Sequence, residues 1–101
     1  MSNIIELETD KFKDFINQDK VIIEFFATWC GPCKNLLQTL EKLSQETKEV
    51  KFAKINIENC SEVCNEFAIR GVPTIIYFEK GKEVKRNNGS LNEQKIKEMF
   101  V

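Results

Sequence analysis

The chain has 101 residues, the size of one domain, and its hydrophobic (42%) and charged (31%) fractions exclude a disordered, fibrous or repeat protein. Its net charge of −1 gives no attraction toward nucleic acid or anionic lipid, and the longest apolar stretch, residues 21–27, is far shorter than the about 20 residues needed to cross a bilayer. We therefore expect a single domain over residues 1–101, with neither nucleic acid nor a membrane as partner.

The first strand candidate is residues 4–7 (I-I-E-L), near the N-terminus. Thr9 or Asp10 is the expected N-cap of the helix that follows, in which apolar residues recur at helical spacing. Residues 1–6 contain neither the basic segment nor the long apolar segment of a signal peptide. We therefore expect a cytoplasmic protein.

The second strand and helix have the strongest patterns. Residues 21–27 are apolar apart from Glu24, which is typical of a central strand buried on both faces. After Pro32, which suits a first helical turn, leucines recur at helical period and predict a helix ending near Thr47.

The third strand is predicted over residues 52–57, from its alternating apolar side chains. The spacing of Asn59 and Glu62 resembles a capping pair for a short helix. That helix is expected to reach Phe67 and to carry Cys60 and Cys64.

The C-terminal part predicts a hairpin and a last helix. Residues 74–79 are rich in β-forming side chains, and Lys80–Gly81 gives a tight reversal into residues 82–88, so these strands should pair antiparallel. Ser90 and Glu93 resemble a capping box. The order βαβαβαββα predicts an α/β fold with a mixed, mostly parallel central sheet flanked by helices.

The four cysteines carry the chemistry that the sequence suggests. Cytosolic thiols are kept reduced, so we expect them to be redox-active or metal-binding rather than structural disulfides. The chain has no histidine, which excludes Ser/His and Cys/His nucleophilic pairs and imidazole metal sites.

Cys30 and Cys33 lie where the central strand ends and the leucine-rich helix begins. Cysteines three positions apart at a helix start are about one turn from each other, close enough for a disulfide. The helix N-terminus stabilises a thiolate, which predicts Cys30 as the nucleophile. Cys33, one turn inside the helix, is expected to be shielded and to resolve the mixed disulfide.

The segment W-C-G-P-C-K at residues 29–34, together with G-V-P-T at residues 71–74, resembles the thioredoxin family over nearly the whole chain. The resemblance implies the thioredoxin fold and a monomeric reductant of disulfides in other proteins. It implies no bound cofactor beyond a reversible Cys30–Cys33 disulfide, and recharging by a thioredoxin reductase.

The resemblance also implies a cis peptide bond before Pro73, which would pack beside the two sulfurs. The Val72 backbone would then face a groove that binds an extended substrate segment by strand addition. The substrate-binding surface implied in this way comprises Trp29, Gly31, Pro32, Gly71, Val72 and Gly89.

Glu24 is the exception in its strand, where family members usually have aspartate. Burial should raise the pKa of its carboxyl group, which makes Glu24 a candidate to accept the Cys33 proton through a water molecule. Lys54 on the neighbouring strand is its expected charge partner. A purely structural buried pair of Glu24 and Lys54 remains an alternative.

Two other functions remain open. A disulfide oxidase or isomerase would use the same dithiol, although Gly31–Pro32 between the cysteines resembles the reductants, and histidine in that gap typifies the oxidising relatives. A scaffold or holdase would use the same fold without the thiols.

Cys60 and Cys64 fit neither a zinc site nor a disulfide. The 26 residues between the two cysteine pairs exceed the roughly 15 to 20 of a zinc ribbon, so we expect no metal. At i and i+4 on a helix their Cβ atoms would lie about 5–6 Å apart, beyond disulfide range. We expect Cys64 to be packed as a small apolar residue and Cys60 to be a partly exposed thiol, with a regulatory or oxidation-sensitive role as the alternative.

Overall fold

The computed structural model describes residues 4–101, so residues 1–3 of the predicted domain lie outside the described part. The helices and strands follow the predicted βαβαβαββα order. They are β1 (Ile5–Glu6), α1 (Thr9–Ile16), β2 (Val21–Phe26), α2 (Gly31–Glu46), β3 (Lys51–Asn56), α3 (Ser61–Glu66), β4 (Thr74–Glu79), β5 (Lys82–Asn88) and α4 (Glu93–Phe100).

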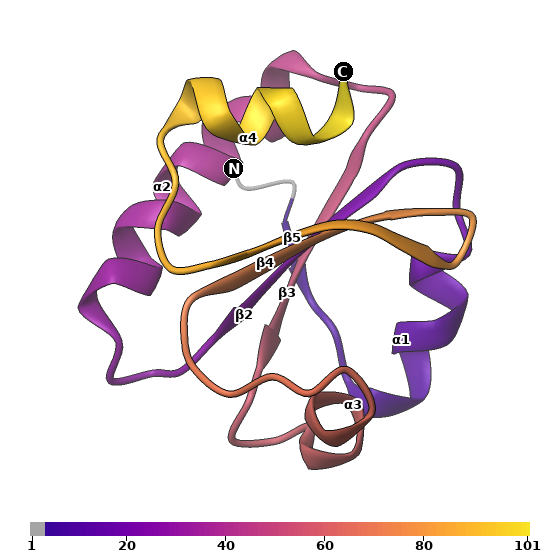
Figure 1. The fold of residues 1–101 in the computed structure, drawn as a ribbon, viewed down its shortest axis with the longest axis vertical. Coiled ribbons are helices and arrows are strands. Elements are labelled where there is room, and N and C mark those ends of the chain that lie inside the picture. Colours follow the sequence, from indigo (N-terminus) through magenta and orange to yellow (C-terminus); the bar gives the residue numbers. More distant parts are fainter. Residues whose placement is uncertain (1–3) are drawn as a thin grey trace.

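The strands form one sheet in the order β1-β3-β2-β4-β5, with β2 at its centre as predicted (Figure 1). The pairings β1–β3 and β2–β3 are parallel, whereas β2–β4 and β4–β5 are antiparallel. Among these strands β4 alone runs opposite to the others, so the sheet is mixed.

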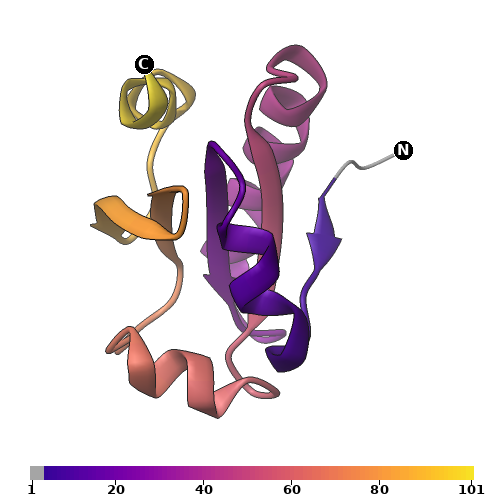
Figure 2. The same ribbon diagram turned by 90° about the vertical axis from the view of Figure 1, so that its right-hand side faces the viewer.

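The helices cover both faces of the sheet: α2 and α4 lie on one side and α1 and α3 on the other (Figures 1 and 2). The residues of β2 alternate between two apolar cores. Ile22 packs with the α2 and α4 side chains, and Ile23 packs with those of α1 and α3. Glu24 therefore shares the α2 side of the sheet with Ile22.

The predicted N-caps of α1 and α3 are wrong by one or two residues. Helix α1 begins after Glu8 rather than after Thr9 or Asp10, and the Glu8 side chain makes no capping hydrogen bond. Helix α3 begins after Cys60, whose carbonyl accepts the first helical hydrogen bond from the Cys64 N–H at 3.1 Å, while Asn59 belongs to a turn with Asn56.

The predicted capping box of α4 is also wrong. The N-cap is Asn92, whose Oδ1 accepts a hydrogen bond from the Lys95 N–H at 2.9 Å. Glu93 does not reach back to Ser90, because its carboxylate pairs with Lys42 and Lys97 at 2.9 and 3.3 Å.

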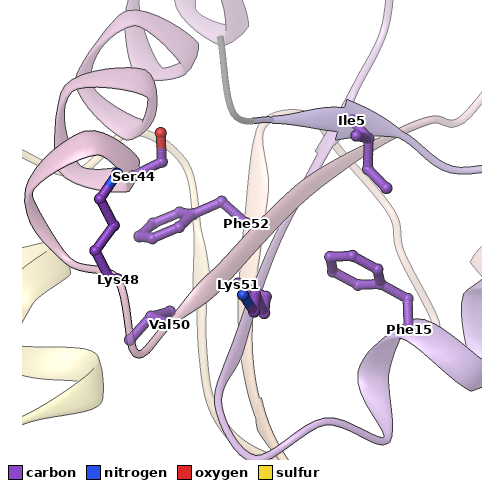
Figure 3. A pocket seen from close by; sticks show the side chains of 7 residues that line it. All are labelled: Ile5, Phe15, Ser44, Lys48, Val50, Lys51 and Phe52. Atoms are coloured by element: carbon purple, nitrogen blue, oxygen red, sulfur yellow. The ribbon is translucent and has the colours of Figure 1, made fainter.

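A hollow of about 330 Å³ lies at the start of β3, between Phe15 of α1 and Phe52 (Figure 3). Ile5 of the edge strand β1 lines the same space. Strand β2 also begins at this end of the sheet, since Val21 pairs with Lys51. The hollow is therefore at the opposite end of the sheet from the cysteines that follow β2. Within residues 4–101, no helix is long and apolar enough to span a membrane.

Candidate active site

Cys30 and Cys33 are joined by a disulfide, with their Cα atoms 5.3 Å apart. Cys30 is the N-cap of α2 in an extended conformation, and its sulfur accepts a hydrogen bond from the Cys33 N–H at 3.1 Å. Pro32 occupies the first turn, where a missing N–H costs no hydrogen bond. The helix therefore begins directly at the first sulfur, which is the position that stabilises negative charge.

The disulfide is buried, whereas the aromatic side chain that precedes it in the sequence is exposed. Cys30 and Cys33 both lie in a small apolar cluster with Ala27, against which Phe26 and Val72 pack. Trp29, directly before Cys30, is 71% exposed. Gly31 and Pro32 are exposed as well. The site thus combines a shielded dithiol with an exposed rim, as a docking surface requires.

The segment Gly71–Thr74 reaches the dithiol from β4, which starts beside the end of β2 because Thr74 pairs with Phe25. The Val72–Pro73 peptide bond is cis, and Pro73 is buried. The Gly89 N–H donates to the Pro73 carbonyl at 2.8 Å. The structure therefore brings the second half of the predicted surface to the same end of the sheet as the cysteines.

Val72 offers free backbone groups at this surface. Within residues 4–101 neither its N–H nor its carbonyl makes a hydrogen bond. Gly71 is exposed, while Val72 and Gly89 are half-buried, and all three line one hollow of about 470 Å³. An extended peptide can satisfy such unpaired backbone groups by adding a strand.

Glu24 is fully buried, at 0% exposure, on the α2 side of the sheet. Neither of its carboxylate oxygens has a hydrogen-bond partner among residues 4–101. Burial raises the pKa of Glu24 from 4.5 to about 8, and the positive charge of Lys54 opposes this shift. The carboxyl group is therefore largely protonated at neutral pH.

Lys54 lies beside Glu24 in the sheet register but does not form a close ion pair with it. The two residues are partners in the parallel β2–β3 ladder. The Lys54 ammonium nitrogen lies 5.4 Å from the centroid of the Phe26 ring, and within residues 4–101 it makes no ion pair of 4.0 Å or less. Its influence on Glu24 is long-range and weaker than the effect of burial.

A cavity of about 240 Å³ connects the buried carboxyl group to the dithiol. Glu24 and Cys33 both line it, as do Lys54 and Leu37, whereas Cys30 does not. A cavity of this size has room for water, and Glu24 supplies polar atoms in need of partners. The two cysteines are therefore distinguished by their surroundings: the first faces the helix N-terminus and the second faces Glu24.

Two residues of the site were not anticipated from the sequence. Glu58 Oε1 accepts hydrogen bonds from both the N–H and the hydroxyl of Thr28, at 3.0 and 2.9 Å. This contact ties the segment before Cys30 to the loop after β3. The predicted topology could have indicated this contact, because loops that follow neighbouring parallel strands leave the sheet at the same edge.

The expectation of a partly exposed Cys60 is wrong, whereas Cys64 packs against the apolar core as expected. Cys60 is 1% exposed and lies in the apolar core, with its Sγ 3.7 Å from the Leu7 carbonyl oxygen. Cys64 is half-buried, one turn along α3. Cys60 precedes the helix, so helical periodicity does not determine which way it faces. No group of three or more His, Cys, Asp or Glu side chains suited to a metal ion occurs within residues 4–101.

Comparisons with known proteins agree with this geometry. The family model described as Thioredoxin matches residues 3–101. The chain is 35% identical over 96 residues to the thioredoxin of Echinococcus granulosus, covering 94% of this chain and 89% of that one. It is 40% identical over 80 residues to the thioredoxin of Chlamydia trachomatis, covering 79% and 78% of the two chains. Among solved structures, a mutant thioredoxin from Halobacterium salinarum superposes with a TM-score of 0.88 at 28% identity, covering 97% and 88% of the two chains.

Proposed function

This chain belongs to the thioredoxin family of thiol-disulfide oxidoreductases, and from that premise we propose that Cys30 is its nucleophile and Cys33 its resolving cysteine. The single observation that carries this assignment is the hydrogen bond from the Cys33 N–H to the Cys30 sulfur. A sulfur that accepts a bond from the first turn of a helix is stabilised in its ionised form.

The reaction starts with the reduced chain. The Cys30 thiolate attacks one sulfur of a substrate disulfide, forms a mixed disulfide and releases the other substrate sulfur as a thiolate. Cys33 then loses its proton and attacks the Cys30 sulfur, which closes the ring and releases the second substrate thiolate. The substrate gains two electrons and two protons, and the chain loses them.

In this proposal Glu24 accepts the proton of Cys33 and, in the reverse reaction, returns it. With its pKa near 8, about a tenth of Glu24 is ionised at pH 7, and this fraction accepts the Cys33 proton through water in the shared cavity. In the reverse direction the protonated carboxyl group returns a proton to Cys33. Lys54 keeps the pKa of Glu24 from rising further, which maintains the ionised fraction.

The proposed docking surface surrounds the sulfurs. Trp29, Gly31 and Pro32 form one side, and Gly71, Val72 and Gly89 form the other, with Pro73 between this side and the dithiol. The free N–H and carbonyl of Val72 would pair with the backbone of the substrate segment.

The finer assignments are also part of this proposal, and family membership and composition support them. They are one domain over residues 1–101, a monomer in the cytoplasm, electron transfer to disulfide-containing proteins and recharging by a thioredoxin reductase. The ordinary charge balance of the chain supports a protein partner over nucleic acid.

The test is reduction of insulin disulfides by the purified chain with dithiothreitol, followed by a redox titration against glutathione. We expect Cys30→Ser to abolish catalysis, Cys33→Ser to accumulate mixed disulfide, and Cys64→Ser, as the matched control, to retain activity. Activity remaining in Cys30→Ser would overturn the nucleophile assignment. A strongly oxidising potential would instead favour a disulfide oxidase or isomerase.

A further inference from the structure

Two guanidinium groups line the hollow beside the dithiol. Arg70 immediately precedes Gly71, and Arg86 comes from β5, which pairs with β4. Among residues 4–101, no acidic side chain lines this hollow of about 470 Å³. Both arginines therefore lie at the proposed substrate groove in a protein whose net charge is −1.

The two arginines differ in availability. Arg86 is held by Glu83 through two hydrogen bonds of 2.8 Å, from its Nε and from one terminal nitrogen. Arg70 is exposed, and in the part of the chain that the structure describes it makes no hydrogen bond or ion pair. The unpaired guanidinium of Arg70 is thus the one free to bind a carboxylate that enters the hollow.

The other charges near the dithiol do not compete with Arg70. Glu58 uses its Oε1 for Thr28, and Glu24 is buried and largely protonated at neutral pH. Lys34 is exposed on α2, lines the cavity on the other side of the dithiol and also carries positive charge. Neither Glu58 nor Glu24 lines the hollow, so the unpaired charge that lines it is the Arg70 guanidinium, which favours a negative side chain there.

We propose that Arg70 is a specificity-determining residue that favours disulfide substrates with an acidic side chain next to the reactive cysteine. The proposal rests on the dithiol function argued above. A substrate segment paired with Val72 is extended, so its side chains alternate in direction and those beside its cysteine come close to residues 70 and 71. The planar guanidinium group matches a carboxylate in a bidentate arrangement, which a lysine does not reproduce.

The test uses two disulfide-linked peptide dimers that are identical except for Glu or Gln on both sides of the cysteine. Each is mixed with the pre-reduced chain, the reaction is quenched with acid, and the second-order rate constant for oxidation of the chain is measured by mass spectrometry. At low ionic strength we expect the Glu peptide to react about three- to five-fold faster, as for an ion pair that stays partly exposed to water. Added salt should reduce this ratio.

Three variants distinguish the effect of Arg70 from that of other positive charges near the dithiol. In Arg70→Gln the Glu/Gln ratio should fall to near one, and in Arg70→Lys it should be intermediate. Lys34→Gln removes an equal charge outside the hollow and should keep most of the ratio. Thermal unfolding of each variant checks its fold.

Equal rates for the two peptides with the native chain would overturn the proposal, as would a ratio that survives Arg70→Gln. Failure of the proposed function gives a different result: neither peptide would then oxidise the Cys30–Cys33 pair of the native chain.

Discussion

The backbone N–H of Cys33 donates a hydrogen bond to the sulfur of Cys30, so that a sulfur takes the place of the usual capping oxygen at the start of α2. An N-cap acceptor that carries negative charge is favoured over a neutral one, because the N-terminus of a helix carries partial positive charge.

We therefore predict that the Cys30 thiol is more acidic than free cysteine, whose pKa is about 8.5. The measurement is the pH dependence of iodoacetamide alkylation in the reduced Cys33→Ser variant. Cys64 is the internal control, because burial and the nearby Cys60 raise its pKa. A Cys30 titration midpoint at or above that of free cysteine would contradict the prediction.

Replacing Glu24 should change the pH dependence of the resolving step. In the native chain the release of a chromogenic thiol from its mixed disulfide with Cys30 should accelerate as pH rises through about 8, where Glu24 ionises. In Glu24→Gln the release should be slower at neutral pH. Glu24→Asp keeps a carboxyl group and should restore part of the rate. Identical profiles for the native chain and Glu24→Gln would remove Glu24 from proton transfer.

The same residue should make folding stability depend on pH. Between pH 4.5 and about 8 the native carboxyl group keeps its proton while the unfolded one loses it. The free energy of unfolding should therefore fall as pH rises through this window, by up to about 1.4 kcal/mol per pH unit, and level off above it. Urea unfolding of the oxidised chain measures this, and the advantage of Glu24→Gln over the native chain should grow with pH. Parallel curves for the two proteins would contradict this prediction.

Ala68 offers a test of backbone conformation at the end of α3. Its φ of 53° lies in the left-handed region, where a Cβ is unfavourable. Ala68→Gly should raise the free energy of unfolding by about 1 kcal/mol, because glycine adopts this conformation without steric cost. Ala68→Val should lower it, since β-branched residues fit this region worst. The prediction fails if both variants shift the denaturation midpoint in the same direction.

The contact between Glu58 and Thr28 should support the segment that carries Trp29 and Cys30. Glu58→Ala removes the acceptor of two hydrogen bonds and should destabilise the protein by about 1 kcal/mol, since the site is exposed. It should also increase amide exchange at Thr28. Thr28→Ser keeps both donors and serves as the matched control. If amide exchange at Thr28 were as slow in Glu58→Ala as in the native chain, the contact would not be what orders this segment.

The bounds of a strand were predictable from the sequence where a run of β-forming side chains ends at a clear turn. The strands Thr74–Glu79 and Lys82–Asn88 have the predicted bounds, because Lys80–Gly81 fixes where each one ends. The disulfide of the W-C-G-P-C segment was predictable for a similar reason, since spacing alone places the two cysteines within bonding distance.

Long-range features could not be predicted in this way. The start of α3 depends on a turn from Asn56 to Asn59, and the direction of Cys60 depends on that start and on Leu7, far away in the sequence. The preference of the Lys54 ammonium group for the Phe26 ring depends on side-chain directions in the folded sheet. None of these contacts has a local sequence signal.

The hairpin turn has a consequence for the distant dithiol. Strand β4 is apolar on both faces, from Ile75 to Phe78, so burial alone would tolerate a slip of one residue along β2. The turn prevents this slip, because the N–H groups of Lys80 and Gly81 are fastened to the carbonyls of Gln18 and Ile16, each at 2.9 Å. The anchored end of β4 therefore fixes the position of its other end, and with it the position of Val72, which packs against the cluster that contains the two cysteines.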